Sequence, residues 1–120
     1  FSVVGTILGG IWANYSWGRF WGWDPKENGA LLICLWQLLI LHGRMGGYTR
    51  DFGLCVLSVV LGVVVVFSWW GVNLLGVGLH SYGFTDGVAS ILKTTYGLEA
   101  LVVLMAGAWK LWSPRARLSA

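Results

Sequence analysis

The segment from residue 52 to residue 75 most constrains the fold, because it is predominantly apolar and contains no charged residue. Its Val-rich middle, Val63 to Val66, suits lipid better than water. Apolar stretches of about 20 residues cross bilayers as helices, since a helix satisfies its own backbone hydrogen bonds in hydrocarbon. We therefore expect residues 52–75 to form a transmembrane helix.

The composition supports the same interpretation for the whole chain. Of the 120 residues, 57% are hydrophobic and 11% are charged, whereas roughly a quarter of the residues in soluble domains are charged. The partner expected on this basis is a lipid bilayer, and no nucleic acid is expected. Cys34 and Cys55 both fall inside apolar runs without a motif partner. Buried packing is therefore expected for them, and not a disulfide or a metal site.

The other apolar stretches complete an all-α fold, a polytopic transmembrane helix bundle with a tryptophan-rich external loop. Residues 1–13 are too few to span about 30 Å at about 1.5 Å per residue. We expect them to be the end of a truncated transmembrane helix, and the chain to be the C-terminal part of a larger protein. The other expected segments are an external loop at 14–25, a transmembrane helix at 26–44, a cytoplasmic loop at 45–51, an external loop at 76–94, a transmembrane helix at 95–112 and a cytoplasmic tail at 113–120.

The positions of lysine and arginine predict the orientation. One side would hold Arg44, Arg50, Lys110, Arg115 and Arg117, and the other Arg19, Lys26 and Lys93. Cytoplasmic loops carry an excess of these residues, so loops 14–25 and 76–94 are expected on the outer face. The expected location is the bacterial inner membrane with the tryptophan-rich loop in the periplasm, or the thylakoid membrane for a plastid protein.

The segment WGRFWGWDPKE, Trp17–Glu27, places aromatic rings directly before a helix start. Its rings belong to Trp17, Phe20, Trp21 and Trp23. Asp24 is suited to the N-cap, Pro25 to the first helical position and Glu27 to a capping box. The sequence therefore predicts an aromatic loop fixed to the mouth of a membrane helix.

His42 and His80 are the only histidines, and the predicted helices place them at opposite faces of the membrane, on the order of 20–30 Å apart. They cannot ligate one metal or one haem together. Each also has an ordinary interpretation: His42 as a headgroup-layer residue, and His80 as a polar contact in a loop. Asp24 and Glu27 likewise have helix capping as their ordinary role.

Rings, glycines and an imidazole on one face suit a large planar apolar ligand, and haem fits this description. Arg19 and Lys26 are expected on the same face, where they could meet the propionates. No residue shows the pattern of a nucleophile or a general base, so positioning is the expected contribution to catalysis.

The stretch WGRFWGWDPKENGALL resembles the WWD signature of the haem-handling membrane proteins of cytochrome c maturation. The WGWDPKE form, LHGR after the next helix and NLLGVGLHSYGF most resemble the CcsA (ResC) type of system II. The resemblance implies a cytochrome c haem lyase or synthase subunit that positions haem b for attachment to apocytochrome c. It also implies a CcsB (ResB)-type membrane subunit or fused domain as partner.

Residue roles follow from the same resemblance. It implies that His80 is an external axial ligand of haem iron, that His42 is a membrane-embedded ligand, and that a haem-holding loop contains Trp17, Trp21, Trp23 and Asp24. A second external histidine would precede the loop, where the chain has none, and a second membrane histidine would lie in the partner or fused domain.

Alternative interpretations remain open. Within the superfamily, Asn28 leans toward the CcmF type of system I, whereas Gly22 favours the CcsA type; a CcmC-type delivery protein is a further relative. A b-type cytochrome subunit would need paired histidines at matching depths in the membrane, and the depths of His42 and His80 do not match. A transporter half would carry polar midplane residues, and apart from Gln37 the predicted helices 26–44 and 52–75 offer almost none.

Overall fold

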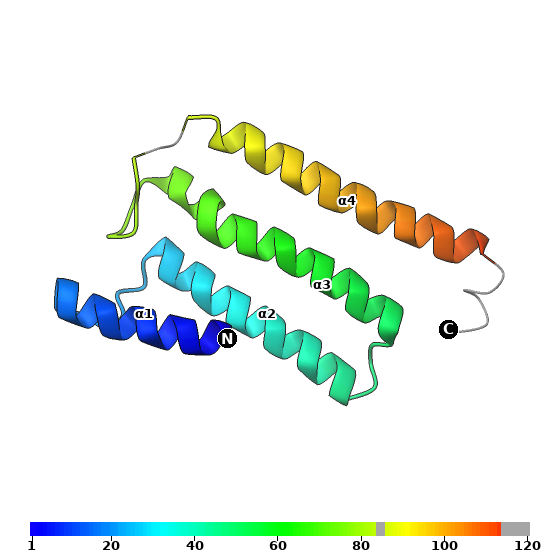
Figure 1. Ribbon diagram of the computed structural model, residues 1–120, viewed down its shortest axis with the longest axis horizontal. Coiled ribbons are helices and arrows are strands. Elements are labelled where there is room, and N and C mark those ends of the chain that lie inside the picture. The colour runs from blue at the N-terminus through cyan, green and yellow to red at the C-terminus, as the bar shows by residue number, and fades with distance from the viewer. Residues whose placement is uncertain (84–85, 114–120) are drawn as a thin grey trace.

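The computed structural model describes residues 1–83 and 86–113, and within these ranges all regular structure is helical (Figure 1). The elements are α1 (Ser2–Trp17), α2 (Pro25–Met45), α3 (Asp51–Val66), a π-helical turn (Phe67–Gly71), a 3-10 turn (Val72–Leu75) and α4 (Val88–Trp112). Three stretches are long and apolar enough to cross a membrane: Pro25–Met45, Asp51–Leu75 and Val88–Trp112. The predicted all-α, polytopic helical fold is confirmed.

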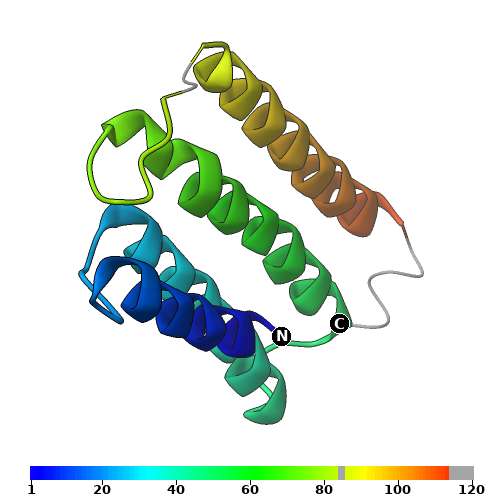
Figure 2. The same cartoon turned by 60° about the vertical axis from the view of Figure 1, so that its left-hand side comes forward.

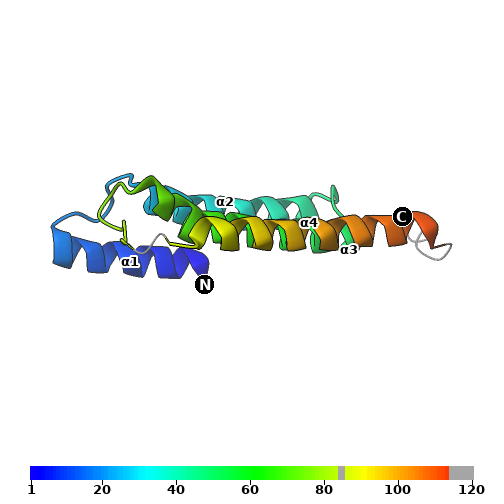
Figure 3. The same cartoon turned by 90° about the horizontal axis from the view of Figure 1, so that it is seen from above.

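The three long helices lie side by side in one row, α2 beside α3 and α3 beside α4 (Figure 1). Seen from above, α1 lies against one face of this row, next to α2 (Figure 3). A layer one helix thick leaves most apolar side chains on its faces, and Leu39, Leu41 and Leu104 are each more than half exposed. Such faces suit hydrocarbon, where exposed leucine costs nothing.

Close approach and one side-chain bond join α2 to α3. The indole Nε1 of Trp36 donates a hydrogen bond to the carbonyl oxygen of Leu57, 3.1 Å away. Gly29 of α2 packs on Ser68, and a Cβ added at Gly29 would lie 2.7 Å from the Cβ of Ser68. Any larger residue at position 29 would therefore push the first turns of α2 away from the π-helical turn that contains Ser68.

Helix boundaries differ from the expected ones at two places. α1 continues to Trp17, beyond the expected end at residue 13, because Gly18 is where the chain adopts a left-handed conformation (φ 73°) that ends a helix. α4 begins at Val88 after Gly87 (φ 76°), before the expected start at residue 95. Trp17 is thus the last residue of a helix and not part of a loop.

Two further expectations have different outcomes. Cys34 is buried as expected, whereas Cys55 is exposed on α3, because a layer one helix thick leaves part of each helix uncovered by the other described helices. The expected tail at 113–120 lies outside the described residues except for Ser113.

Candidate functional site

A capping box fixes the segment that leads into α2. Asp24 is the N-cap, and its Oδ1 accepts a hydrogen bond from the backbone N–H of Glu27 at 3.0 Å. Glu27 returns the contact, since its Oε2 accepts from the backbone N–H groups of Asp24 at 3.2 Å and Gly22 at 2.6 Å. Both carboxylates are buried, with 6% and 7% exposure. The predicted helix start is therefore also a rigid support for the residues before it.

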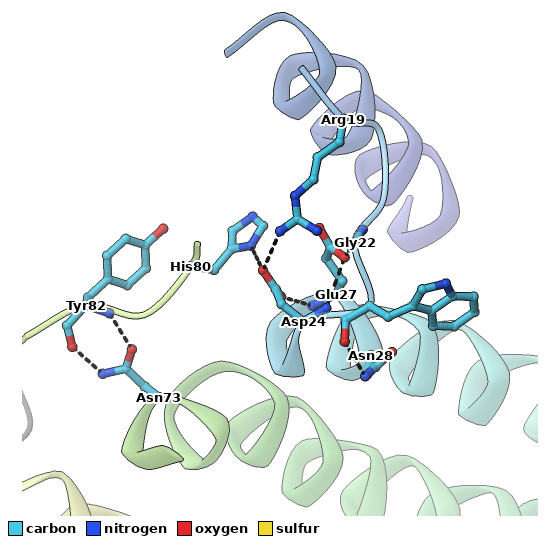
Figure 4. Close-up of polar contacts among 9 residues, drawn as sticks. Arg19, Gly22, Asp24, Glu27, Asn28, Asn73, His80 and Tyr82 are labelled. Atoms are coloured by element: carbon cyan, nitrogen blue, oxygen red, sulfur yellow. Dashed lines mark hydrogen bonds and ion pairs between the residues drawn. The ribbon is translucent and has the colours of Figure 1, made fainter. Parts of the chain in front are cut away.

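The second oxygen of Asp24 contacts His80, which arrives from the loop after α3. Figure 4 shows His80 and Arg19 converging on Asp24 Oδ2, with His80 Nδ1 at 2.7 Å and the Arg19 guanidinium at 3.8 Å. Trp17 packs edge-on against the imidazole, with ring centroids 4.7 Å apart. Gly78 (φ 90°) allows the approach, because a Cβ there would lie 2.6 Å from the Cβ of Asp24.

The charge of Asp24 determines which nitrogen of His80 is protonated. Burial raises the pKa of Asp24, but hydrogen bonds from His80 and the Glu27 N–H, with the charges of His80 and Arg19, outweigh it and leave the pKa below its ordinary value of 3.8. Asp24 is therefore a carboxylate at neutral pH and accepts the Nδ1–H of His80. A neutral His80 in this tautomer carries its lone pair on Nε2, the atom a metal ligand must offer.

A cavity of about 510 Å³ lies beside this cluster, within the usual size of small-molecule sites. Its walls come from α1, α2, the π-helical turn and the loop after α3, which folds back over the start of α2 (Figure 2). Its lining includes Gly5, Gly9, Phe20, Trp21, Lys26, Ser68, Trp69, His80 and Tyr82. A Cβ added at Gly5 or Gly9 would meet nothing within 4 Å, so the α1 wall leaves open space.

The cavity also offers polar groups. The ammonium of Lys26 lies 4.0 Å from the ring centroid of Tyr82 and 6.0 Å from that of Trp69. Trp21 Nε1 and Ser68 Oγ are buried and have no hydrogen-bond partner among the described residues. A ligand that is mostly apolar but carries hydrogen-bonding or anionic groups would match this lining.

A sequence model of the family described as "Cytochrome C assembly protein" matches residues 1–80. The chain belongs to this cytochrome c assembly family. The matched region contains α1, the capping box, α2, α3 and His80.

Three similar relatives each carry the name "Cytochrome c biogenesis protein CcsA". They come from Chlorella vulgaris (48% identical over 88 residues, 72% of this chain and 27% of the relative), Parasynechococcus marenigrum strain WH8102 (44% over 85 residues, 71% and 28%) and Calycanthus floridus var. glaucus (40% over 83 residues, 69% and 26%). The resemblance to the CcsA type is confirmed. The chain spans about a quarter of the length of these relatives, and no solved structure matches it.

The structure of this cytochrome c assembly protein brings together only part of the predicted site. Trp17, Asp24 and His80 are in contact, and Trp21 lines the cavity. Trp23, with φ 58° and 67% exposure, points outward, although its ring meets that of Trp21 edge-on at 5.9 Å.

His42 lies elsewhere, about 27 Å along α2 from Asp24 at 1.5 Å per residue. It is exposed, and its Nδ1 lies 2.8 Å from the carbonyl oxygen of Leu38 in its own helix. Because a carbonyl only accepts, Nδ1 is the donor, which again leaves the lone pair of a neutral ring on Nε2.

The ligand atoms of Asp24, Glu27 and His80 lie within 4.8 Å of one another, close enough for a metal ion. Asp24 uses both oxygens for protein donors, however, and Glu27 Oε2 accepts from two N–H groups. The cluster therefore serves as a support that orients His80.

Sequence reasoning missed two polar residues in apolar surroundings. Asn73, at the end of the Asp51–Leu75 span, is 1% exposed and bonds the loop that carries His80. Glu99 of α4 faces Gly62 of α3, and its Oε2 and the hydroxyl of Tyr96 are buried without a hydrogen-bond partner among the described residues. Polar residues within apolar runs were the available signal for both.

Proposed function

We propose that this chain holds haem b on the outer side of a membrane and presents it for attachment to apocytochrome c. The observation that carries the proposal is the hydrogen bond from His80 Nδ1 to the buried Asp24 carboxylate at the edge of an aromatic-lined cavity. Family membership supports a role in cytochrome c assembly. The size and the largely apolar, aromatic lining of the cavity support a large, mostly apolar ligand.

The residues present fit haem. His80 would hold the haem iron through Nε2, and its bond to Asp24 would fix its tautomer and the plane of its ring. Lys26 is placed to pair with a propionate, and the unpartnered Trp21 Nε1 could donate to the same group. Phe20, Trp21 and Trp69 would cover the ring and exclude water.

The chemistry that haem supplies when bound is a pair of vinyl groups that can receive cysteine thiols. This chain would hold haem in one orientation beside the incoming apocytochrome. Positioning alone can contribute several orders of magnitude to a reaction rate. Trp17 would support this role, because its edge-to-face contact with the His80 ring limits rotation of the imidazole.

His42 is proposed as a ligand of a second, membrane-embedded haem site that supplies the outer one. Its exposure on α2 favours a site completed by another helix, either from a CcsB-type subunit or from a fused domain. The outer site would likewise be completed by a histidine from outside this chain. The membrane would be a bacterial inner membrane or a thylakoid membrane.

His80→Ala in the full-length protein tests the outer site. The variant should purify with altered haem absorbance and fail to mature cytochrome c, and added imidazole should restore both in part because it can fill a vacated axial position. Ser81→Ala, the neighbouring change in the same loop, is the control. Wild-type absorbance and maturation in His80→Ala without imidazole would refute the role of His80.

A further inference from the structure

One buried side chain closes the loop that carries His80. Asn73 donates from Nδ2 to the carbonyl oxygen of Tyr82 at 2.9 Å and accepts the backbone N–H of Tyr82 on Oδ1 at 3.0 Å (Figure 4). A single amide thus pairs with both backbone groups of one residue, as a neighbouring β-strand would. Asn73 is 1% exposed, so water does not compete for these bonds.

The closed loop has little other internal support. Between Asn73 and Tyr82 the described backbone bonds are Gly76 N–H to Asn73 O at 3.2 Å and Ser81 N–H to Gly78 O at 3.2 Å. Gly76 and Gly78 both have positive φ, 64° and 90°, which makes this path accessible to many alternative conformations when its end is released. The pairing of Asn73 with Tyr82 is therefore a contact that favours one of them, beside the contact of His80 with Asp24.

His80 lies two residues before the clamped position, and its side chain must reach Asp24 on the opposite segment. Tyr82 itself places its ring 4.0 Å from the Lys26 ammonium at the cavity wall. Both the imidazole and the cation–π contact depend on where the backbone of Tyr82 is held. The amide of Asn73 is the common support for the two.

We propose that Asn73 is a positioning residue for His80: its amide holds the loop so that the imidazole meets Asp24 and presents Nε2 to the cavity. The orientation of His80 follows from these contacts alone, and only the consequence for haem rests on the proposed function. Asn73 is not itself one of the residues that line the cavity, so its effect would pass through Tyr82 and the loop.

The first test uses the full-length protein without haem. Carbethoxylation of His80 by diethyl pyrocarbonate is followed by mass spectrometry, with exposed His42 in the same molecule as internal reference. Asn73→Asp keeps the size and the acceptor but replaces the donor toward Tyr82 O with a second acceptor. It should speed modification of His80 by about fivefold or more relative to His42, since a hydrogen bond to a buried group is lost.

Asn73→Ser is the second variant, because its hydroxyl can pair with only one group of Tyr82 and should give an intermediate rate. Asn14→Asp, the same chemical change at an exposed position of α1, should leave the rate unchanged. An unchanged ratio of His80 to His42 modification in both Asn73 variants overturns the proposal, and an increase confined to His80 supports it.

The second test uses the haem-loaded protein. Asn73→Asp should show the absorbance change of a lost axial imidazole, and free imidazole should restore the wild-type spectrum, which it would not do for a general folding defect. The positioning role would be overturned if His80→Ala alters the haem spectrum but Asn73→Asp, despite faster modification of His80, does not. If His80→Ala itself keeps the wild-type spectrum, the proposed function fails, and the modification rates alone still decide whether Asn73 orients His80.

Discussion

Asp24 and His80 lie 56 positions apart in the sequence, and their side chains meet at 2.7 Å. Asp24 has two structural roles, because Oδ1 caps α2 while Oδ2 holds the imidazole. The start of α2 and the orientation of the His80 imidazole therefore both depend on one carboxylate. Substitutions that separate the two roles provide the sharpest tests.

Asp24→Asn should keep the cap and weaken the support of His80, because asparagine caps helices about as well as aspartate but carries no charge. Loss of a carboxylate behind a ligating histidine typically costs about 10–100-fold in affinity, and we expect a loss of that order for haem. Titration of the apo-protein with haem measures it. Asp51→Asn, which changes an exposed carboxylate bonded to Arg44, is the control; equal affinities in the two variants would contradict the role of Asp24.

The lowered pKa of Asp24 predicts a pH dependence of stability. A carboxyl group whose pKa is lower in the folded state binds protons more readily when unfolded, so it stabilises the fold above its unfolded pKa. This contribution should be present above about pH 4 and should disappear as the pH falls below the ordinary value of 3.8, through the lowered pKa of the folded state. Thermal unfolding in detergent between pH 2 and pH 6 would show the wild type approaching Asp24→Asn at the acid end; a constant difference would contradict this.

Gly78→Ala should displace the loop from Asp24. The residue has φ 90°, and an added Cβ would lie 2.6 Å from the Cβ of Asp24; a left-handed conformation alone costs a non-glycine residue about 1–2 kcal/mol. We expect reduced haem binding and faster amide exchange in residues 76–82. Gly83→Ala is the control variant, since nothing lies within 4 Å of its added Cβ. It should behave as the wild type. Similar exchange in both variants would be evidence against a tight contact.

The two histidines should fail at different steps. His42→Ala should purify with little haem anywhere, because the outer site would not be supplied, whereas His80→Ala should receive haem and hold it poorly. Haem per protein and yield of holocytochrome c, with and without imidazole, distinguish the variants. A normal haem content in His42→Ala would leave His42 as an interfacial residue only.

Labelling of single introduced cysteines, in a protein that lacks Cys34 and Cys55, would determine the orientation of the chain across the membrane. An impermeant thiol reagent should label Ser81→Cys in intact cells. Tyr48 lies between α2 and α3 and is 90% exposed, and the reagent should label Tyr48→Cys only after permeabilisation. The reverse pattern would invert the topology.

Local sequence patterns were sufficient for the helices and for the capping box, because each depends on residues within a few positions of one another. The span Asp51–Leu75 is recognisable from its predominantly apolar character. The capping box is recognisable from the spacing of Asp24 and Glu27. The continuation of α1 to Trp17 was missed, since Asn14 to Ser16 favour neither helix nor loop strongly enough to decide.

Contacts between distant segments could not be predicted in the same way. His80 was identified as a candidate by its type, but no local pattern indicates that it meets Asp24. Asn73 is one polar residue in an apolar run, and its role depends on the return of the loop to Tyr82. Cys55 was expected inside because its run is apolar, whereas in a single layer of helices an apolar run is exposed on its outer faces.

The π-helical turn at Phe67–Gly71 has a consequence for the rotational phase of the helix that follows it. A π turn holds about one residue more than an α turn, so every later side chain is rotated by about 100° around the axis compared with an uninterrupted helix. Asn73 is the second residue after this turn. Deleting one residue from the turn would restore the α period and swing the amide away from Tyr82 without changing Asn73 itself. The direction in which the Asn73 amide points therefore depends on the number of residues in the π-helical turn that precedes it.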